Sequence, residues 1–194
     1  MKTIIKNTAI LLTITLIAGF ALAFVYELTK APIAGAEEEE KNDAYAAVFA
    51  EASSFEECKT DISSYSAPKG VTVNEVRNAV DSSGNLLGWV MTITCSEGYG
   101  GDITIALGIT GEGAITSMTV ISMSETAGLG AKCTSEGFLG QFKGIKSQSV
   151  KYTQEGKSAP DEIDAISGAT ITTKAVTKAV NAGLSLAYGT LMQK

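Results

Sequence analysis

The longest uninterrupted apolar segment of the chain lies near its N-terminus. Residues 8–26 carry no charged side chain, and Lys2 and Lys6 precede them. At about 1.5 Å of rise per residue, a helix over this segment spans nearly 30 Å, the thickness of the hydrocarbon core of a bilayer. Positive charges are retained on the cytoplasmic side of a span. The pattern therefore predicts a cytoplasmic N-terminus and a single transmembrane anchor within residues 1–30.

A cleaved signal peptide is the alternative interpretation of this segment. The small residues Ala34, Gly35 and Ala36 resemble a cleavage site, but they lie about ten residues beyond the apolar stretch. That stretch is also long for the hydrophobic region of a signal peptide. We therefore expect a retained, single-pass anchor in the cell (inner) membrane, followed by one extracytoplasmic domain over residues 31–194.

The rest of the chain contains some segments with the periodicity of a helix and others with the periodicity of a strand. Residues 38–58 place apolar side chains close to a period of 3.6 and predict a helix, and residues 61–70 are polar and predict a loop. Residues 135–142 predict a short helix and residues 149–153 a short strand. Two strand pairs are predicted around turns, namely 71–80 with 86–95, and 103–109 with 114–122.

A second long amphipathic segment closes the chain. Its apolar residues recur at steps of three and four and predict one buried face of a helix, formed by Ile171, Ala175, Ala179, Val180, Gly183, Leu184, Ala187 and Leu191. The domain thus has hairpins of strands in its middle and helices at its two ends. This order indicates an α+β domain, in which helices flank an antiparallel sheet.

Composition excludes several kinds of chemistry. The 194 residues have a net charge of −6, so a nucleic-acid partner is not expected. The chain has no histidine, which excludes Ser-His-Asp and Cys-His catalysis and histidine-based metal sites. Any redox chemistry must therefore come from a cofactor. Cys58, Cys95 and Cys133 have no Cys-x-x-Cys spacing, so neither a metal site nor a particular disulfide is predicted.

Two glycine-rich stretches follow predicted strands. Gly98-Tyr99-Gly100-Gly101 is either a plain hairpin turn or a place where the backbone approaches a flat ring closely, with Tyr99 beside it. Ser124 to Gly130 is either a simple connection or a loop that meets a ligand with mixed polarity. In the second case Thr126 and backbone N–H groups address polar edges, and Leu129 covers an apolar face.

The third stretch, Asp164 to Thr170, immediately precedes the C-terminal helix. A helix N-terminus offers unpaired N–H groups and a positive dipole end, which favour phosphate, and Gly168 removes side-chain bulk beside it. Thr170 adds a hydroxyl that can carry a phosphoester. The alternative is that a Ser or Thr in Ser167-Gly-Ala-Thr170 simply caps the helix.

The three stretches together resemble a known family. Asp164 to Thr170 resembles the flavinylation motif of membrane-anchored FMN-binding subunits, and Gly98–Gly101 and Glu125–Gly130 resemble two further segments of the same proteins, in the same order. The chain is most similar to the G subunit of the Rnf ion-translocating ferredoxin:NAD oxidoreductase complex. It is next most similar to the C subunit of the sodium-pumping NADH:quinone reductase. Ala127 stands where the family usually has proline.

The resemblance implies a function and a set of site residues. It implies an electron-carrier subunit of an oxidoreductase complex, in which a separate flavin transferase joins FMN to Thr170 through a phosphoester. The partners would be the other membrane and peripheral subunits, and no catalytic side chain or metal is expected. The remaining implied cofactor-binding residues are Ser167, Gly168, Ala169, Thr172, Thr173, Lys174, Tyr99, Gly100, Gly101, Glu125, Thr126, Gly128, Leu129 and Gly130. The competing class is a non-redox, membrane-tethered binding module of the envelope.

Overall fold

The computed structural model describes residues 1–62 and 65–193, without the side chains of residues 34 and 37. The predicted loop 61–70 therefore includes two residues that lie outside the described part. The chain forms two compact units, Met1–Glu40 and Lys41–Lys194, and each is described by itself.

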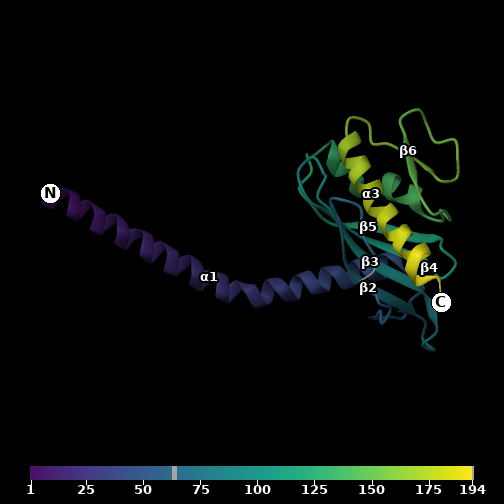
Figure 1. Ribbon diagram of the computed structural model, residues 1–194, viewed down its shortest axis with the longest axis horizontal. Helices are drawn as coiled ribbons and strands as arrows, with labels where there is room; N and C mark the ends of the chain where they lie inside the picture. The colour runs from purple at the N-terminus through teal and green to yellow at the C-terminus, as the bar shows by residue number, and fades with distance from the viewer. Residues whose placement is uncertain (63–64, 194) are drawn as a thin grey trace. The chain divides into compact units, whose positions relative to one another are not determined.

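The first unit consists of one continuous helix, α1 (Lys2–Val48), whose last turns belong to the second unit (Figure 1). The helix is long and apolar enough to cross a membrane by length and composition. Its hydroxyl side chains donate to carbonyl oxygens one turn earlier, as Thr13 does to Ala9 over 2.9 Å and Thr29 to Val25 over 3.0 Å. Such bonds satisfy hydroxyl groups where no water is available. The predicted N-terminal apolar helix is confirmed.

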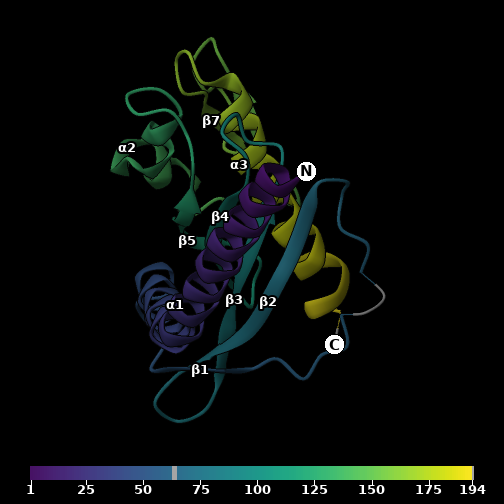
Figure 2. The ribbon, with the colours of Figure 1, turned by 90° about the vertical axis from the view of Figure 1, so that its left-hand side faces the viewer.

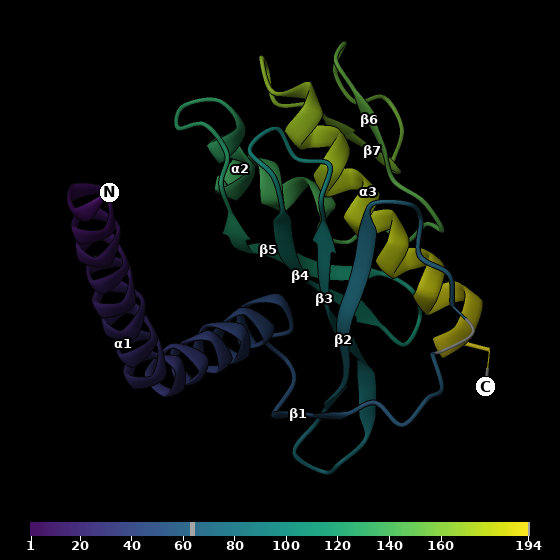
Figure 3. The same ribbon diagram turned by 60° about the vertical axis from the view of Figure 1, so that its left-hand side comes forward.

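The second unit is built on a five-stranded antiparallel sheet in the order β1-β2-β3-β4-β5 (Figures 1 and 3). Each strand pairs antiparallel with its neighbour in the sequence, so the sheet is a meander. The strands are β1 (Ser54–Glu57), β2 (Val71–Val80), β3 (Leu86–Cys95), β4 (Ile103–Thr110) and β5 (Ile115–Met123). The four strands predicted as two hairpins are confirmed within one residue at each end, and the α+β class is confirmed.

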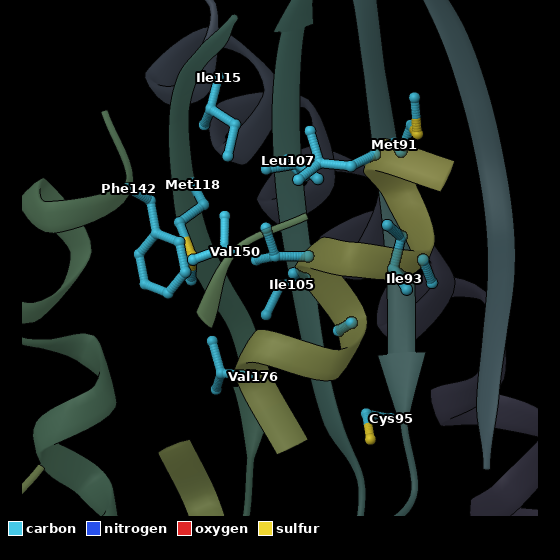
Figure 4. Packing of buried hydrophobic residues seen from close by; sticks show 14 of the residues in the cluster. Met91, Ile93, Cys95, Ile105, Leu107, Ile115, Met118, Phe142, Val150 and Val176 are labelled. Atoms are coloured by element: carbon cyan, nitrogen blue, oxygen red, sulfur yellow. The ribbon is translucent and has the colours of Figure 1, made fainter. Parts of the chain in front are cut away.

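Helix α3 (Thr170–Leu186) and a π-helical turn (Ala187–Leu191) cover one face of the sheet. Side chains alternate across a strand, so Met91, Ile93 and Cys95 of β3 all point to this face. They pack with Ile105 and Leu107 of β4 and with buried residues of α3 in the main core (Figure 4).

The last turns of α1 cover the opposite face. Tyr45, Val48 and Phe49 form a second buried cluster with Val90 and Ala106 of the sheet. The Tyr45 hydroxyl is 2.7 Å from the Thr92 hydroxyl, and burial raises the pKa of Tyr45. The part of α1 that belongs to the second unit thus contributes to the packing of the domain.

The prediction of a helix over residues 38–58 is wrong beyond Val48. Ser53 leaves the helical path by donating its N–H to the Val80 carbonyl over 2.8 Å, and Phe55 pairs with Ala79 in β1. The Phe55 ring still contacts the Tyr45 ring at 5.7 Å between centroids. Phe55 therefore packs on the helix cluster while its backbone forms a strand, which explains the misleading period.

A short two-stranded sheet was only half predicted. β6 (Lys151–Thr153) matches the expected strand, and it pairs in parallel with β7 (Glu162–Asp164), which the sequence pattern did not predict. The expected helix at 135–142 is α2 (Glu136–Leu139) followed by a 3₁₀ turn (Gly140–Phe142), and a further 3₁₀ turn (Gly130–Thr134) precedes it. Figure 2 shows β7 beside the first turns of α3, at the end where the candidate site lies.

Candidate functional site

The three glycine-containing stretches meet at one end of the sheet. β3 and β5 run in the same direction, with Cys95 paired to Ile103 and Ile103 paired to Met123. The loops that follow β3 and β5 must therefore lie at the same end of the sheet. Figure 3 shows the beginning of α3 and the β3–β4 loop at this end. Segments that are 25 and 47 residues apart come into hydrogen-bond contact here.

A pocket of about 490 Å³ opens between these stretches. Its walls come from the β3–β4 loop, the loop after β5 and the first turn of α3. The lining residues are Tyr99, Glu125, Thr126, Leu129, Gly130, Gly168, Ala169, Thr170, Ile171 and Thr172. Nine of these ten were predicted from the sequence as site residues; the exception is Ile171.

Exposed apolar side chains gather in this pocket. Among the described residues from Lys41 onward, the exposed large apolar side chains are Leu86, Tyr99, Leu129, Tyr152 and Ile171. Three of them line the pocket, with exposed fractions of 70% for Tyr99, 46% for Leu129 and 52% for Ile171. Apolar side chains left in water beside a concavity indicate a ligand with an apolar face.

Thr170 is the first residue of α3, and its side chain is exposed. Ala169 holds the N-cap position and makes no side-chain cap bond, so neither Ser167 nor Thr170 caps the helix. The buried Thr173 hydroxyl accepts from the Ile166 N–H over 3.0 Å and donates to the Ala169 carbonyl, so it ties the preceding loop to the first turn of the helix. The capping interpretation of Thr170 is wrong, and its hydroxyl remains available.

The start of α3 presents free backbone donors to the pocket. Within residues 65–193, the N–H groups of Thr170, Ile171 and Thr172 donate to no protein acceptor. The preceding Gly168 has φ = +77°, a conformation that side-chain-bearing residues rarely adopt. An anion placed here would meet three unpaired donors and the positive end of the helix dipole.

A second, more polar pocket of about 340 Å³ lies on the other side of Thr170. Its lining residues are Gln154, Ala165, Ile166, Ser167, Gly168 and Thr170. Gln154 donates from Nε2 to the Thr170 hydroxyl oxygen over 3.0 Å. Sequence reasoning missed Gln154, because it follows β6 and only the unpredicted β6–β7 pairing brings it to α3. It also missed Ile171, because the spacing of apolar residues along the helix placed Ile171 on the buried face, whereas its side chain is exposed.

Glu125 connects all three stretches. Its Oε1 accepts from the Gly100 N–H over 3.1 Å, and its Oε2 accepts from the Thr172 hydroxyl over 2.6 Å. A β-carbon on Gly130 would overlap the same Oε2 atom. The pocket wall is therefore held together by one carboxylate.

Several predicted residues lie outside this pocket. Gly100, Gly101 and Gly128 do not line it, and a β-carbon on Gly100 would instead overlap the Ser124 carbonyl oxygen. The missing side chain of Gly100 thus serves the contact between two loops. The Thr173 side chain is buried and hydrogen-bonded to the Ile166 and Ala169 backbone, and Lys174 lines a separate pocket beside Lys178. Lys178 pairs with Glu97 over 2.6 Å and lowers the pKa of that carboxyl group.

The three cysteines are unpaired. Cys95 and Cys133 are buried, and burial, with a contribution from the Glu125 charge, raises the pKa of Cys133 to about 11. No cluster of metal-ligating side chains is found among the residues that the structure describes.

Comparison with known proteins agrees with this geometry. Residues 98–185 match the FMN-binding domain family, and residues 1–48 match the RnfG N-terminal region. The first match covers both loops and the start of α3.

Relatives and a solved structure extend the comparison. The chain is 33% identical to the G subunit of the proton-translocating ferredoxin:NAD(+) oxidoreductase complex of Clostridium ljungdahlii, over 87% of this chain and 84% of the relative. It is 31% identical to the G subunit of the Na(+)-translocating complex of Acetobacterium woodii, over 95% and 92%. The crystal structure of Shewanella oneidensis NqrC shares the fold, with a TM-score of 0.50 and 21% identity over 72% of this chain and 69% of that one. The chain therefore belongs to the FMN-binding G-subunit family of the Rnf ion-translocating oxidoreductase complexes.

Proposed function

We propose that this chain carries FMN on Thr170 and passes electrons between neighbouring redox centres of a membrane-bound ferredoxin:NAD(+) oxidoreductase complex. One relative named above belongs to a proton-translocating complex and the other to a Na(+)-translocating complex. The proposal therefore concerns electron transfer and does not include the identity of the translocated ion. The observation that supports the proposal most is the place of Thr170. Its exposed hydroxyl stands at the unpaired start of α3, on the wall of a pocket with three exposed apolar side chains.

The pocket suits the two halves of FMN. A volume of about 490 Å³ falls in the range of small-molecule sites. Tyr99, Leu129 and Ile171 would contact the apolar part of the ring system, and Thr126 would meet its polar edge. The phosphate would lie at the first turn of α3. Bound there, FMN supplies electron acceptance and donation, which the side chains of this chain cannot perform.

A covalent bond explains how the cofactor would be retained. Each helix-dipole contact to a phosphate contributes only about 0.3–1 kcal/mol, or about 2 kcal/mol when partly buried. The pocket is open to solvent, so these contacts alone would allow FMN to dissociate. A phosphoester from Oγ1 of Thr170 would prevent this loss, and the exposure of Thr170 would give a flavin transferase access to the hydroxyl.

The proposed partners follow from the same placement. The other membrane and peripheral subunits of the complex would exchange electrons with the flavin, and α1 would hold the domain at the membrane. We propose that residues 31–194 form the extracytoplasmic domain, since Lys2 and Lys6 would keep the N-terminus in the cytoplasm.

Intact mass and in-gel fluorescence test the attachment. After denaturing electrophoresis, only covalently bound flavin fluoresces, and the wild-type mass should exceed the sequence mass by one FMN less water. Thr170→Ala should lose both signals and remain folded, because it removes one exposed hydroxyl. Ser82→Ala removes an exposed hydroxyl in the β2–β3 turn, away from both pockets, and should keep both signals. Retention of the added mass in Thr170→Ala would assign the bond to another residue.

A further inference from the structure

Glu125 is the acidic side chain on the wall of the main pocket. It belongs to the loop after β5, and both of its carboxylate oxygens are used within the protein. One accepts from the backbone of the β3–β4 loop and the other from a side chain of α3. Glu125 therefore touches every segment that forms the pocket.

Two positions beside this carboxylate are glycine, and a side chain at either of them would collide with it. A β-carbon on Gly98 would come within 2.8 Å of Glu125 Oε1, and one on Gly130 would overlap Oε2 and come within 2.7 Å of the Thr172 hydroxyl. Glycine at position 130 leaves room for the carboxylate, and glycine at position 98 also avoids the Gly101 carbonyl oxygen, which a β-carbon there would overlap. The three segments are thus fitted around the Glu125 carboxylate.

The charge of Glu125 has no cationic partner. Among the described residues the carboxylate makes no ion pair, and its two donors are a neutral N–H and a neutral hydroxyl. Its field extends to the 3₁₀ turn that follows, because it contributes to the raised pKa of Cys133. An unpaired negative charge at a half-buried position acts strongly on a neighbouring redox group, since screening by solvent is incomplete.

We propose that Glu125 is a positioning residue that sets both the shape of the pocket and the reduction potential of the flavin. Through its two hydrogen bonds it holds the β3–β4 loop and the first turn of α3 at a fixed separation. Through its charge it opposes the addition of an electron to a flavin in the pocket and so lowers the reduction potential. The second role rests on the proposed function, whereas the first concerns the protein alone.

Two substitutions separate geometry from charge. Glu125→Gln keeps a carbonyl oxygen for the Gly100 N–H, and its amide group can donate to the Thr172 hydroxyl, so both links are retained without the charge. Glu125→Ala removes both links. Glu112→Gln removes a carboxylate charge from an exposed turn that does not line the pocket and is the matched control.

The geometric role is tested in flavin-free protein that carries Thr170→Ala. Hydrogen exchange of the Gly100 amide should accelerate at least tenfold in Glu125→Ala and remain within threefold of the parent in Glu125→Gln and Glu112→Gln. Equal exchange in the alanine variant and the parent would overturn the positioning role. This outcome is independent of whether the protein binds FMN.

The electrostatic role is tested by redox titration of the flavin-loaded protein. Glu125→Gln should raise the equilibrium constant for one-electron reduction about tenfold, which corresponds to a shift of about +59 mV. Glu112→Gln should leave the potential unchanged. An unchanged potential in Glu125→Gln, with FMN bound, would overturn this role alone. Absence of covalent FMN from the wild type would instead contradict the proposed function and leave the exchange result standing.

Discussion

The side-chain amide of Gln154 donates a hydrogen bond to the hydroxyl oxygen of Thr170 over 3.0 Å. Gln154 follows β6, and Thr170 begins α3 sixteen residues later. Because Gln154 is the donor, the hydroxyl keeps its own proton and can release it when the oxygen forms a new bond. The contact holds Oγ1 at the boundary between the polar pocket and the larger pocket.

Gln154→Ala is expected to slow flavin attachment without abolishing it. One hydrogen bond of this kind contributes about 0.5–1.5 kcal/mol, so attachment by the transferase should slow roughly 2- to 10-fold. The increase in intact mass, followed over time with purified transferase and a flavin donor, measures the rate. Gln148→Ala removes an exposed glutamine elsewhere on the domain and should not change it. An unchanged rate in Gln154→Ala would show that this contact does not orient the hydroxyl.

Gly100→Val is expected to affect stability and the flavin together. A β-carbon at this position overlaps the Ser124 carbonyl oxygen, so the loop after β5 must move, and with it Thr126 and Leu129 on the pocket wall. Overpacking of this kind typically costs about 1–3 kcal/mol. The melting temperature should fall, and the absorbance spectrum of attached flavin should shift.

Gly111→Ala is the matched control for this variant. Gly111 also lies in a hairpin turn, but a β-carbon there would meet the nearest atom, the Leu87 carbonyl oxygen, at an ordinary 3.6 Å. It should change neither property substantially. A destabilised Gly100→Val protein with an unperturbed flavin would mean that the β3–β4 loop does not influence the pocket.

Local patterns were sufficient to predict most of the fold. β2 alternates in polarity, β3 to β5 are rich in β-branched and other apolar residues, and turns separate the four strands, so each strand could be recognised from its own residues. β7 has only three residues, too few to show a strand period, and it forms by pairing with β6. The helix prediction failed after Val48 for a related reason, since Phe55 satisfies the helical period by packing on Tyr45 from a strand.

The candidate site was predictable where adjacent residues carry the signal. Tyr99, Leu129 and Thr170 belong to short distinctive stretches, and the structure brings them to one pocket. The contacts between stretches were not predictable, because no local pattern relates Glu125 to Thr172 or Gln154 to Thr170. These contacts form because β3 and β5 end at the same end of the sheet and α3 begins there.

Stability should fall in alkaline solution, partly through Cys133. Burial raises the pKa of this thiol from 9.0 to about 11 in the folded protein. Between these values the unfolded chain releases a proton that the folded protein keeps, so the free energy of unfolding decreases as pH rises. The contribution is present below pH 9 and is lost toward pH 11, at up to about 1.4 kcal/mol per pH unit.

Cys133→Ala should therefore make the pH dependence between 9 and 11 less steep, although the lost side chain lowers stability at every pH. Denaturant titrations at several pH values measure the slope independently of this offset. Val150→Ala truncates a buried side chain that carries no titratable group, so it should lower stability and keep the wild-type slope. An equal slope in Cys133→Ala and wild type would show that the Cys133 thiol does not contribute.

The orientation of the chain in the membrane is the last prediction. Lys2 and Lys6 precede the apolar part of α1, so the N-terminus should remain in the cytoplasm and the domain should lie outside. Cys95 and Cys133 are buried and would not report this, so exposed positions must be used. In a Cys58→Ala background, a membrane-impermeant thiol reagent should label Gln148→Cys in intact spheroplasts and Thr3→Cys only after lysis. Both positions are exposed in the folded protein, so protection of either one reports the membrane and not burial. The reverse pattern would place the flavin domain in the cytoplasm and contradict the proposed topology.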